Sequence, residues 1–325
     1  MSAYLIRRLL YAVPLLLGVN ILTFLLFFVV NTPDDMARMQ LGQKRVGPEA
    51  IRDWKHERGY DLPLLWNEGA EGTAQVTETI FYQKSVGLFL FRFGRSDQGR
   101  DIGADIRTRM WPSLAIATPS LVLGVAVNVS LALLVVLFRL TYLEFWGMAL
   151  CVALMSVSSL FYIIGGQYLF GKLLQLVPIS GYDGGRDAWR FLILPLTISV
   201  ISGIGSGVRW YRTLFLDEVE KDYVRTARAK GLGELRVLFT HVLRNALIPI
   251  LTGIVVLLPL LFTGSLLNES FFAIPGLGSY TIDAIQQQDF AIVRSMVYLG
   301  STLYILGLLL TDISYTLVDP RVRLH

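Results

Sequence analysis

The amino-acid sequence predicts an all-α integral membrane protein with six transmembrane helices and an external segment between the first two. Hydrophobic residues make up 54% of its 325 residues and charged residues only 17%, whereas soluble domains carry roughly 25% charged residues. Its mean hydropathy is +0.55. A bilayer is crossed by about 20 predominantly apolar residues, and six apolar runs of that kind cover residues 9–30, 113–138, 145–170, 191–210, 246–271 and 296–318.

The first apolar run follows Arg7 and Arg8, as the core of a signal peptide would. It is too long for such a core and no small-residue cleavage site follows it, so we expect it to remain as an anchor.

Cys151 is the only cysteine, which excludes an intrachain disulfide and a cysteine-based metal site. The histidines lack metal-site spacing, and the basic residues gather at helix ends and in one loop, which argues against nucleic acid as a partner.

The positions of the basic residues predict the orientation, because short cytoplasmic loops carry an excess of Lys and Arg. Arg7 and Arg8 place the N-terminus in the cytoplasm, and Arg321 and Arg323 place the C-terminus there. The loop 211–245 falls on the same side and holds the basic residues Arg212, Lys221, Arg225, Arg228, Lys230, Arg236 and Arg244. The predicted regions are therefore the N-terminus with the first span (1–30), an external segment (31–112), a transmembrane core (113–318) and a cytoplasmic tail (319–325).

The external segment carries local signals of folded structure. Pro48 suits a first helical position, Ile51 and Trp54 share one face and Gly59 suits a cap, which predicts an amphipathic helix over 48–58 that could lie on the membrane surface. The β-favouring residues at 77–81 predict a hairpin strand, and the apolar residues at 87–93 predict a membrane-interface segment.

The inner loop predicts two helices. The first runs from Leu216 to Gly231, with acidic residues in its first turns and basic residues in its last. The second places its apolar residues Leu235, Leu238, Phe239, Val242, Leu243 and Ala246 on one face. Arg236, Thr240 and Arg244 are stacked four apart on another face. These residues alone leave two interpretations open: helices whose basic side chains touch lipid phosphates, or a surface that meets a partner protein.

Several strings together resemble the permeases of binding-protein-dependent ABC importers of the dipeptide, oligopeptide and nickel class. The most specific are YVRTARAKGL at 223–232 and RNALIP at 244–249, which are similar to the cytoplasmic coupling loop of that family. The other matching strings are YLIRRLL at 4–10, FGRS at 93–96, residues 106–114, ESFFAIPGLG at 269–278, DISY at 312–315 and DPR at 319–321. The resemblance implies a type I ABC importer permease fold and a multi-pass protein of the bacterial inner membrane.

The resemblance implies that the inner loop docks in a groove on an ATP-binding subunit. The residues expected to take part are Tyr223, Arg225, Thr226, Ala227, Ala229, Lys230, Gly231 and Leu232. In the general motif Glu-Ala-Ala-x-x-x-Gly, Arg225 and Thr226 replace the Glu and the first Ala, which argues against a fixed salt bridge at Arg225. Gly231 permits a sharp turn, and an ordinary helix cap is the alternative interpretation there.

The string after the fifth span implies an external gate or a docking surface for a solute-binding protein, formed by Glu269, Pro275, Gly276 and Gly278. The alternative is a simple helix end whose acid reaches toward water. Asn128 and Asn268 are polar residues at or near spans that could line the pathway, although such residues more often bond a neighbouring helix. Gly203 and Gly207 in the string GIGSG fit close helix packing rather than a nucleotide loop, because no strand precedes the string and it lacks the Gly-Lys-Ser/Thr ending.

The resemblance further implies the partners. They are a second homologous permease subunit, two cytoplasmic ATP-binding subunits and an extracytoplasmic solute-binding protein, with membrane lipid around the chain. ATP and Mg would bind to the ATPase subunits and no cofactor to this chain, which we expect to be non-catalytic. Peptides are the leading substrate class, with nickel or another solute as alternatives, and the stretch 67–85 departs from the shorter family loop.

The competing classes, a secondary carrier or channel and an intramembrane enzyme, would need ionisable or catalytic groups inside the spans, and the six runs contain almost none at midplane.

Overall fold

The computed structural model describes residues 2–42, 47–185 and 187–318. Within these residues the chain is built from helices and turns, and the single β-bridge joins Arg95 to Asp101. The tail at 319–325, predicted to be cytoplasmic, lies outside the described residues. The described chain forms two compact units, one of residues up to 111 together with 280–309, and one of residues 112–279 together with 310–318.

Five helices of the described chain are long and apolar enough to cross a membrane. They are Leu10–Val30, Ile102–Leu137, Ala188–Val219, Glu234–Phe271 and Phe290–Ser314. A further pair, Tyr142–Ser156 and Ser159–Leu173, passes the same test together but is bent by 87°. Counting the pair as one span gives the six that the sequence predicts.

The bend corrects the prediction of one uninterrupted helix over 145–170. Val157 and Ser158 both have extended backbone conformations, with ψ of 126° and 144°. Two extended residues end the helical hydrogen-bond ladder, and Ser158 begins the next helix in the N-cap position that serine favours. The apolar composition continues through this break, which is why hydropathy alone does not reveal it.

The first unit contains α1 (Ser2–Phe24), which continues through η1 (Leu25–Val30), and the helices that follow it. These are α2 (Pro33–Leu41), α3 (Pro48–Arg58), α4 (Ala74–Thr77), η2 (Tyr82–Val86), α5 (Gly87–Phe89) and the first part of α6 (Ile102–Leu137). Most of α14 (Leu277–Gln286) and of α15 (Phe290–Val318) also belongs to it. Its core is formed by Phe24, Phe28, Met36, Ala37, Ile51, Trp54, Tyr60 and Ile80.

The predicted helix over 48–58 is confirmed at both ends. Pro48 occupies the first turn of α3, and Gly59 ends the helix with φ of 64° in the left-handed region. Ile51 and Trp54 share a buried face, as their spacing predicts. That face packs on the chain's own core beside Phe28 and Tyr60, so it is not available to lie on a membrane surface.

The predicted strand over 77–81 is wrong. Thr77 ends α4, and the residues up to Phe81 lead into η2. The backbone N–H groups of Ile80 and Phe81 donate to the carbonyls of Pro63 and Leu64 at 3.0 Å each, and Ile80 is buried. No second strand in the described chain pairs with these β-favouring residues. Ile80 instead packs into the core of the unit. In the predicted interface segment 87–93, Leu88 is buried whereas Leu90 and Phe91 are exposed.

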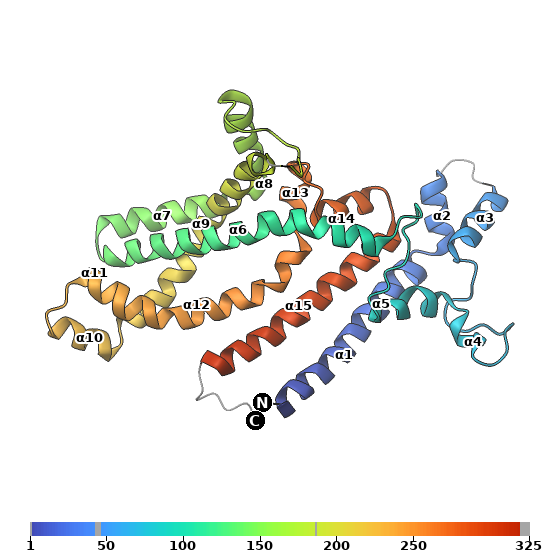
Figure 1. Cartoon of the computed structure of the whole chain (residues 1–325), viewed down its shortest axis with the longest axis horizontal. Coiled ribbons are helices and arrows are strands. Elements are labelled where there is room, and N and C mark those ends of the chain that lie inside the picture. The colour runs from blue at the N-terminus through green and yellow to red at the C-terminus, as the bar shows by residue number, and fades with distance from the viewer. Residues whose placement is uncertain (1, 43–46, 186, 319–325) are drawn as a thin grey trace. The chain divides into compact units, whose positions relative to one another are not determined.

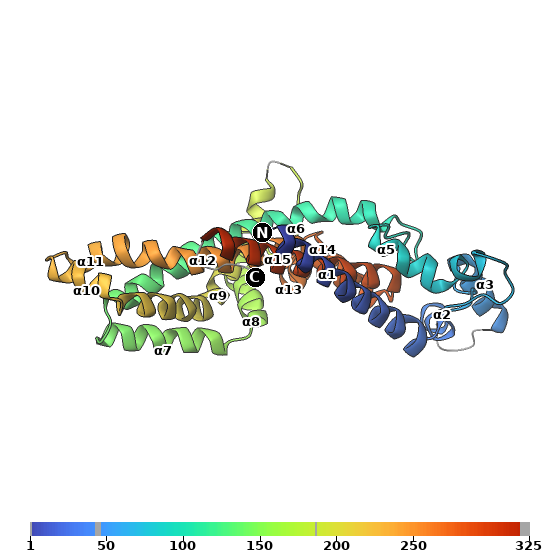
Figure 2. The ribbon, with the colours of Figure 1, turned by 90° about the horizontal axis from the view of Figure 1, so that it is seen from below.

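The second unit contains the rest of α6 and the helices up to the start of α14. They are α7 (Tyr142–Ser156), α8 (Ser159–Gly166), η3 (Gln167–Leu173), α9 (Ala188–Val219), α10 (Asp222–Ala229), α11 (Glu234–Val237), η4 (Leu238–Val242), α12 (Leu243–Leu257), η5 (Pro259–Thr263) and α13 (Leu266–Phe271). Helix α7 runs alongside α9 (Figures 1 and 2). An ion pair between Glu144 and Arg212 joins the two helices.

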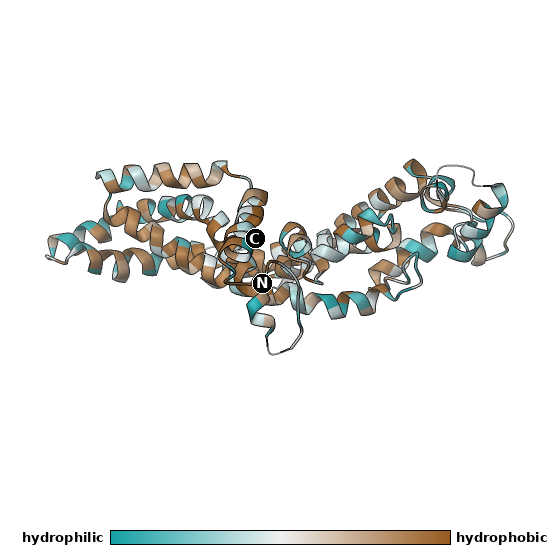
Figure 3. Ribbon diagram, turned by 90° about the horizontal axis from the view of Figure 1, so that it is seen from above, coloured by the Kyte–Doolittle hydropathy of each residue, from teal (hydrophilic) through white to brown (hydrophobic). Residues whose placement is uncertain are grey.

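Glycine allows the close packing of α7 and α9. A Cβ atom at Gly205 would lie 2.5 Å from the Cys151 carbonyl oxygen, whereas one at Gly203 would meet nothing within 4 Å. Close packing was predicted for Gly203 and Gly207. It is found at Gly207, where a Cβ atom would lie 2.3 Å from the Asn128 side chain, and at Gly205 instead of Gly203. Hydrophobic residues run along α7 and α12 (Figure 3), and large apolar side chains such as Phe145 and Trp146 are exposed. Exposed apolar helix surface of this kind is expected where lipid surrounds a protein.

Candidate functional site

Helix α10 is the short polar helix of the inner loop, and it lies between the end of α9 and the start of α11 (Figure 1). The predicted first helix began at Leu216, but Leu216 and Val219 belong to α9. Lys221 is the N-cap of α10 with an extended ψ of 151°, and this break separates the two helices. The acidic residues Asp217 and Glu218 therefore end α9 rather than begin α10.

One face of α10 is part of the chain's own core. Val224 and Ala227 are buried against Val219 of α9 and against Val237 and Val242 beyond the loop. Ala227, which the resemblance places among the docking residues, therefore packs inward and helps to hold α10 in place. Its part in docking stays a prediction.

The hydroxyl of Tyr223 ties α10 to α9. It donates a hydrogen bond to Glu218, which also pairs with Lys221. Burial of the phenol, and then its bond to the Glu218 carboxylate, raise the pKa of Tyr223 to about 12. The aromatic ring is partly buried against the same core, so the predicted anchor is engaged within the chain.

The other face of α10 is exposed. It presents the side chains of Asp222, Arg225, Thr226, Ala229 and Lys230. Arg225 pairs with Asp222 at 3.5 Å, and both side chains are mostly in solvent. Such surface pairs contribute little to stability, so these side chains are free to exchange their contacts for those of a partner.

Gly231 ends α10 in a Schellman motif. Its φ is 80°, its N–H donates to Arg228 O at 2.9 Å, and the N–H of Leu232 donates to Ala227 O at 3.4 Å. This is the hydrogen-bond pattern of a left-handed glycine cap, so the helix-cap interpretation holds for Gly231. Leu232 packs partly against the core, and the sharp turn delivers the chain to α11.

Arg228 and Glu234 join α10 to α11. The Arg228 Nε lies 2.7 Å from Glu234 Oε1, and a second nitrogen lies 3.3 Å from Oε2. This two-point pair has the geometry in which Arg–carboxylate contacts are strongest. Sequence reasoning placed Arg228 among the loop's basic residues without a partner, because Glu234 lies across the turn at Gly231.

The predicted second helix is continuous with the fifth span, and its buried face differs from the prediction. Leu238, Val242 and Ala246 are buried as expected, together with Val237, but Leu235 and Phe239 are 59% and 58% exposed. The π-helical turn η4 changes the angle per residue relative to a regular α-helix, which explains the shift. Arg236, Thr240 and Arg244 are exposed as predicted. The inner loop therefore exposes two large apolar side chains in addition to the exposed face of α10.

The string at 269–278 folds into a closed turn around a buried carboxylate. Glu269 is 1% exposed, and its oxygens accept the N–H groups of Ser265 at 2.9 Å, Gly278 at 2.7 Å and Ser279 at 3.1 Å. The alternative of an acid that reaches toward water is therefore wrong. A Cβ atom at Gly278 would lie 2.6 Å from the Ser265 carbonyl carbon, so glycine is needed for this approach.

The surface of that turn is small. Gly276 and Gly278 are buried and Pro275 is exposed. The Ser113 hydroxyl accepts the N–H of Leu277 at 2.8 Å and fixes the start of α14 to α6. A role of Glu269, Pro275, Gly276 and Gly278 in an external gate or docking surface stays a prediction.

The two asparagines predicted to line the pathway have different surroundings. Asn268 donates to the Ser199 hydroxyl at 2.6 Å, which is the bond to a neighbouring helix that the alternative predicts. Asn128 lies against Gly207, and its Oδ1 has no hydrogen-bond partner among the described residues. Asn128 lines a cavity of about 340 Å³ together with Gly203, Ser206 and other residues of α6, α9 and α12. Pathway lining by Asn128 and Asn268 stays a prediction.

Comparison with known families decides the class of the protein. Residues 130–324 match the model of the binding-protein-dependent transport system inner membrane component, and residues 1–68 match the model of its N-terminal region. The chain belongs to this family. The predicted class is confirmed: the protein is a membrane permease with the type I ABC importer permease fold.

Relatives of the permease are similar over its whole length. A protein of Brucella abortus (strain 2308) named as a peptide transport system permease is 33% identical over 99% of both chains. The di/tripeptide transport system permease protein DppB of Pseudomonas aeruginosa (strain UCBPP-PA14) is 31% identical over 99% of both chains. The dipeptide transport system permease protein DppB of Escherichia coli (strain K12) is 29% identical, again over 99% of both.

Proposed function

We propose that this permease carries short peptides inward and is driven by ATP-binding subunits that dock on α10. The observation that supports this most directly is the two-sided character of α10. Its Val224 and Ala227 face is buried in the permease core, while its opposite face exposes Arg225, Thr226 and Ala229. A helix held firmly on one side and free on the other is suited to receive a partner and transmit its movement.

The transmission path follows from the contacts of α10. Tyr223 bonds to Glu218 at the end of α9, and Arg228 pairs with Glu234 at the start of α11. The helix from α11 through α12 is continuous and apolar enough to span the membrane. A displacement of α10 therefore moves the inner ends of two membrane helices together.

The complete transporter is proposed to contain a second homologous permease, two ATP-binding subunits and an extracytoplasmic solute-binding protein. Both termini and the loop 211–245 lie in the cytoplasm, with the segment 31–112 outside. Peptides are the proposed substrates because the similar proteins named above are peptide, dipeptide and di/tripeptide permeases. Nucleotide and Mg bind to the ATPase subunits.

A pair of cysteine variants tests the docking surface and the orientation. Ala229 is exposed on α10 and Ala104 is exposed in the first turn of α6, and the native Cys151 is buried. In a Cys151→Ser background, Ala229→Cys should cross-link to a cysteine-bearing ATPase subunit through a bifunctional maleimide, and Ala104→Cys should not. A membrane-impermeant maleimide should label only Ala104→Cys in cells with intact inner membranes. Equal cross-linking of both variants, or peptide transport by the permease without ATPase subunits, would overturn the proposal.

A further inference from the structure

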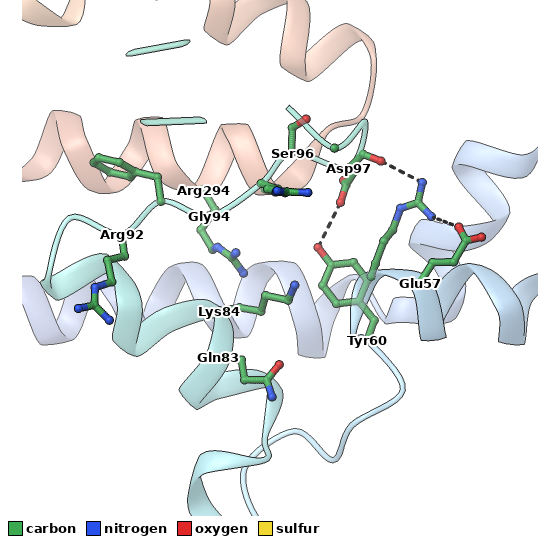
Figure 4. Close-up of a pocket in the computed structure, with 14 residues that line it drawn as sticks. Glu57, Tyr60, Gln83, Lys84, Arg92, Gly94, Ser96, Asp97 and Arg294 are labelled. Carbon is green, nitrogen blue, oxygen red and sulfur yellow. Dashed lines mark hydrogen bonds and ion pairs between the residues drawn. The ribbon is translucent and has the colours of Figure 1, made fainter. Parts of the chain in front are cut away.

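The first unit contains a solvent-accessible polar cavity whose lining shares no residue with α10 or the Glu269 turn. Its volume is about 360 Å³, within the range of small-molecule sites. The lining comes from α3, η2, the loop at 92–99 and α15, and includes the basic residues Arg58, Lys84, Arg92, Arg95 and Arg294. Figure 4 shows several of these side chains around Tyr60 and Asp97.

The lining of this cavity is mostly basic. It holds the five basic residues Arg58, Lys84, Arg92, Arg95 and Arg294 and the two acidic residues Glu57 and Asp97. A further carboxylate, that of Asp289, accepts the backbone N–H of Asp97. Glu57, Arg92 and Arg95 are exposed at the edge, where solvent screens their charges.

The carboxylates of Asp97 and Asp289 already accept hydrogen bonds from other groups of the chain. Asp289 accepts the N–H groups of Asp97 at 3.1 Å and Ile292 at 3.2 Å. Asp97 accepts the Tyr60 hydroxyl at 3.4 Å and a Gln40 amide N–H at 3.3 Å. Arg58 is also occupied, since it donates to the Asp97 carbonyl at 3.0 Å and pairs with Glu57 at 3.3 Å.

Lys84 and Arg294 are the basic groups left over. Neither has an ion pair or a hydrogen bond from its side chain to any residue that the structure describes, and Arg294 is only 4% exposed with an unpartnered Nε. The Lys84 ammonium lies 5.1 Å from the centre of the Tyr60 ring. Burial, and then repulsion from Arg294, lower the pKa of Lys84. Buried charges are normally paired. Arg294 is buried, yet Asp97 acts on it only through its charge and not through a direct contact.

We infer that this cavity binds the carboxylate of a small organic anion between Lys84 and Arg294. The lining carries more basic than acidic residues, so it favours an anion. An Arg guanidinium and a Lys ammonium are both favourable donors to a carboxylate. The Ser96 and Gln83 side chains on the lining supply further polar groups for the remainder of the ligand.

The test uses the purified full-length permease in lipid nanodiscs, without ATPase subunits, so that its outcome is independent of coupling through α10. The probes are N-acetyl-dialanine and its C-terminal amide, which differ by one negative charge at the proposed contact. Isothermal titration should show binding of the carboxylate at least tenfold tighter than of the amide. Equal affinities, or no binding of the carboxylate, would overturn the inference without need of any variant.

Variants locate the contact. Lys84→Gln should weaken carboxylate binding at least tenfold. The matched control is Lys172→Gln, because Lys172 also lies over a tyrosine ring, 5.7 Å from that of Tyr168, but does not line this cavity. It should change the affinity less than twofold. Identical affinities for the two variants would contradict the assignment.

A second arm distinguishes the source of the carboxylate. Association of the solute-binding protein is measured with the same two variants. If Lys84→Gln impairs only that association and N-acetyl-dialanine does not bind, the carboxylate belongs to an acidic side chain of the binding protein. That result would overturn the small-molecule site.

Discussion

Replacing Gly278 with alanine should destabilise the permease strongly, because Gly278 lies against backbone atoms that cannot move independently. The added Cβ would lie 2.6 Å from the Ser265 carbonyl carbon, 2.7 Å from its oxygen and 2.8 Å from Leu266 N. An ordinary contact needs at least about 3.4 Å, so the start of α14 must withdraw by roughly 0.6–0.8 Å. That movement lengthens the 2.7 Å bond from Gly278 N to Glu269 to about 3.3–3.5 Å, past the usual range of such bonds.

The expected cost has two parts. Overpacking of this kind costs about 1–3 kcal/mol, and loss of a hydrogen bond to a charged group costs about 1.5–3 kcal/mol. The variant Gly278→Ala should therefore lose about 2.5–6 kcal/mol of the free energy of unfolding. The control is Gly203→Ala within α9, where a Cβ meets nothing within 4 Å and alanine should be neutral or stabilising by up to about 1 kcal/mol.

The assay is equilibrium unfolding of the purified permease in mixed micelles, as the denaturing detergent fraction is raised and near-UV circular dichroism reports the folded state. A loss of less than about 1 kcal/mol in Gly278→Ala, or a loss equal to that of Gly203→Ala, would refute the idea that the turn is held rigid by the buried Glu269 carboxylate. Such a result would mean that the backbone relaxes around the methyl group.

Two further predictions concern the coupling segment. Gly231→Leu should uncouple ATP hydrolysis from peptide uptake, because Gly231 has φ of 80° and a left-handed L-residue costs about 1–2 kcal/mol. The control is Gly233→Leu, which should transport normally because Gly233 has φ of −64°. Normal uptake by Gly231→Leu would contradict the prediction. Tyr223→Phe tests the bond to Glu218. Because the folded-state pKa of Tyr223 is about 12 against about 10 in the unfolded chain, the unfolded state deprotonates first, and the stabilising effect present below pH 10 is lost as the pH rises toward 12. The stability difference between wild type and Tyr223→Phe should shrink across that window, and a difference that is constant with pH would show that Tyr223 does not titrate as this contact requires.

Local signals in the sequence were sufficient for some elements. Pro48 and Gly59 mark the two ends of α3 because each has a backbone preference that few other residues share, and both ends are as predicted. The apolar runs located the spans because the length needed to cross a bilayer is fixed. The 87° break at Val157 and Ser158 could not be predicted from hydropathy, because the residues on both sides of it are apolar.

Features that depend on distant contacts were not predictable in this way. In the sequence, Glu269 is a carboxylate near the end of a span. Its structural role is visible only in the fold, where the N–H groups of Gly278 and Ser279 donate to its oxygens. Lys84 and Arg294 are separated by more than two hundred residues, and no spacing rule brings them to one cavity. The exposure of Leu235 and Phe239 depends on a π-helical turn, which hydrophobic periodicity cannot anticipate.

The proposed coupling through α10 depends on the buried, inward face of this helix. If Val224 and Ala227 were exposed, α10 could pivot on its two connections and a partner's movement would be absorbed in the loop. Their burial against Val219, Val237 and Val242 instead joins α10 to residues at both ends of the loop. Tyr223 and Arg228 add one polar tie in each direction. Because closely packed interiors transmit displacement rather than absorb it, a movement applied at Arg225 and Ala229 reaches α9 and α12 together.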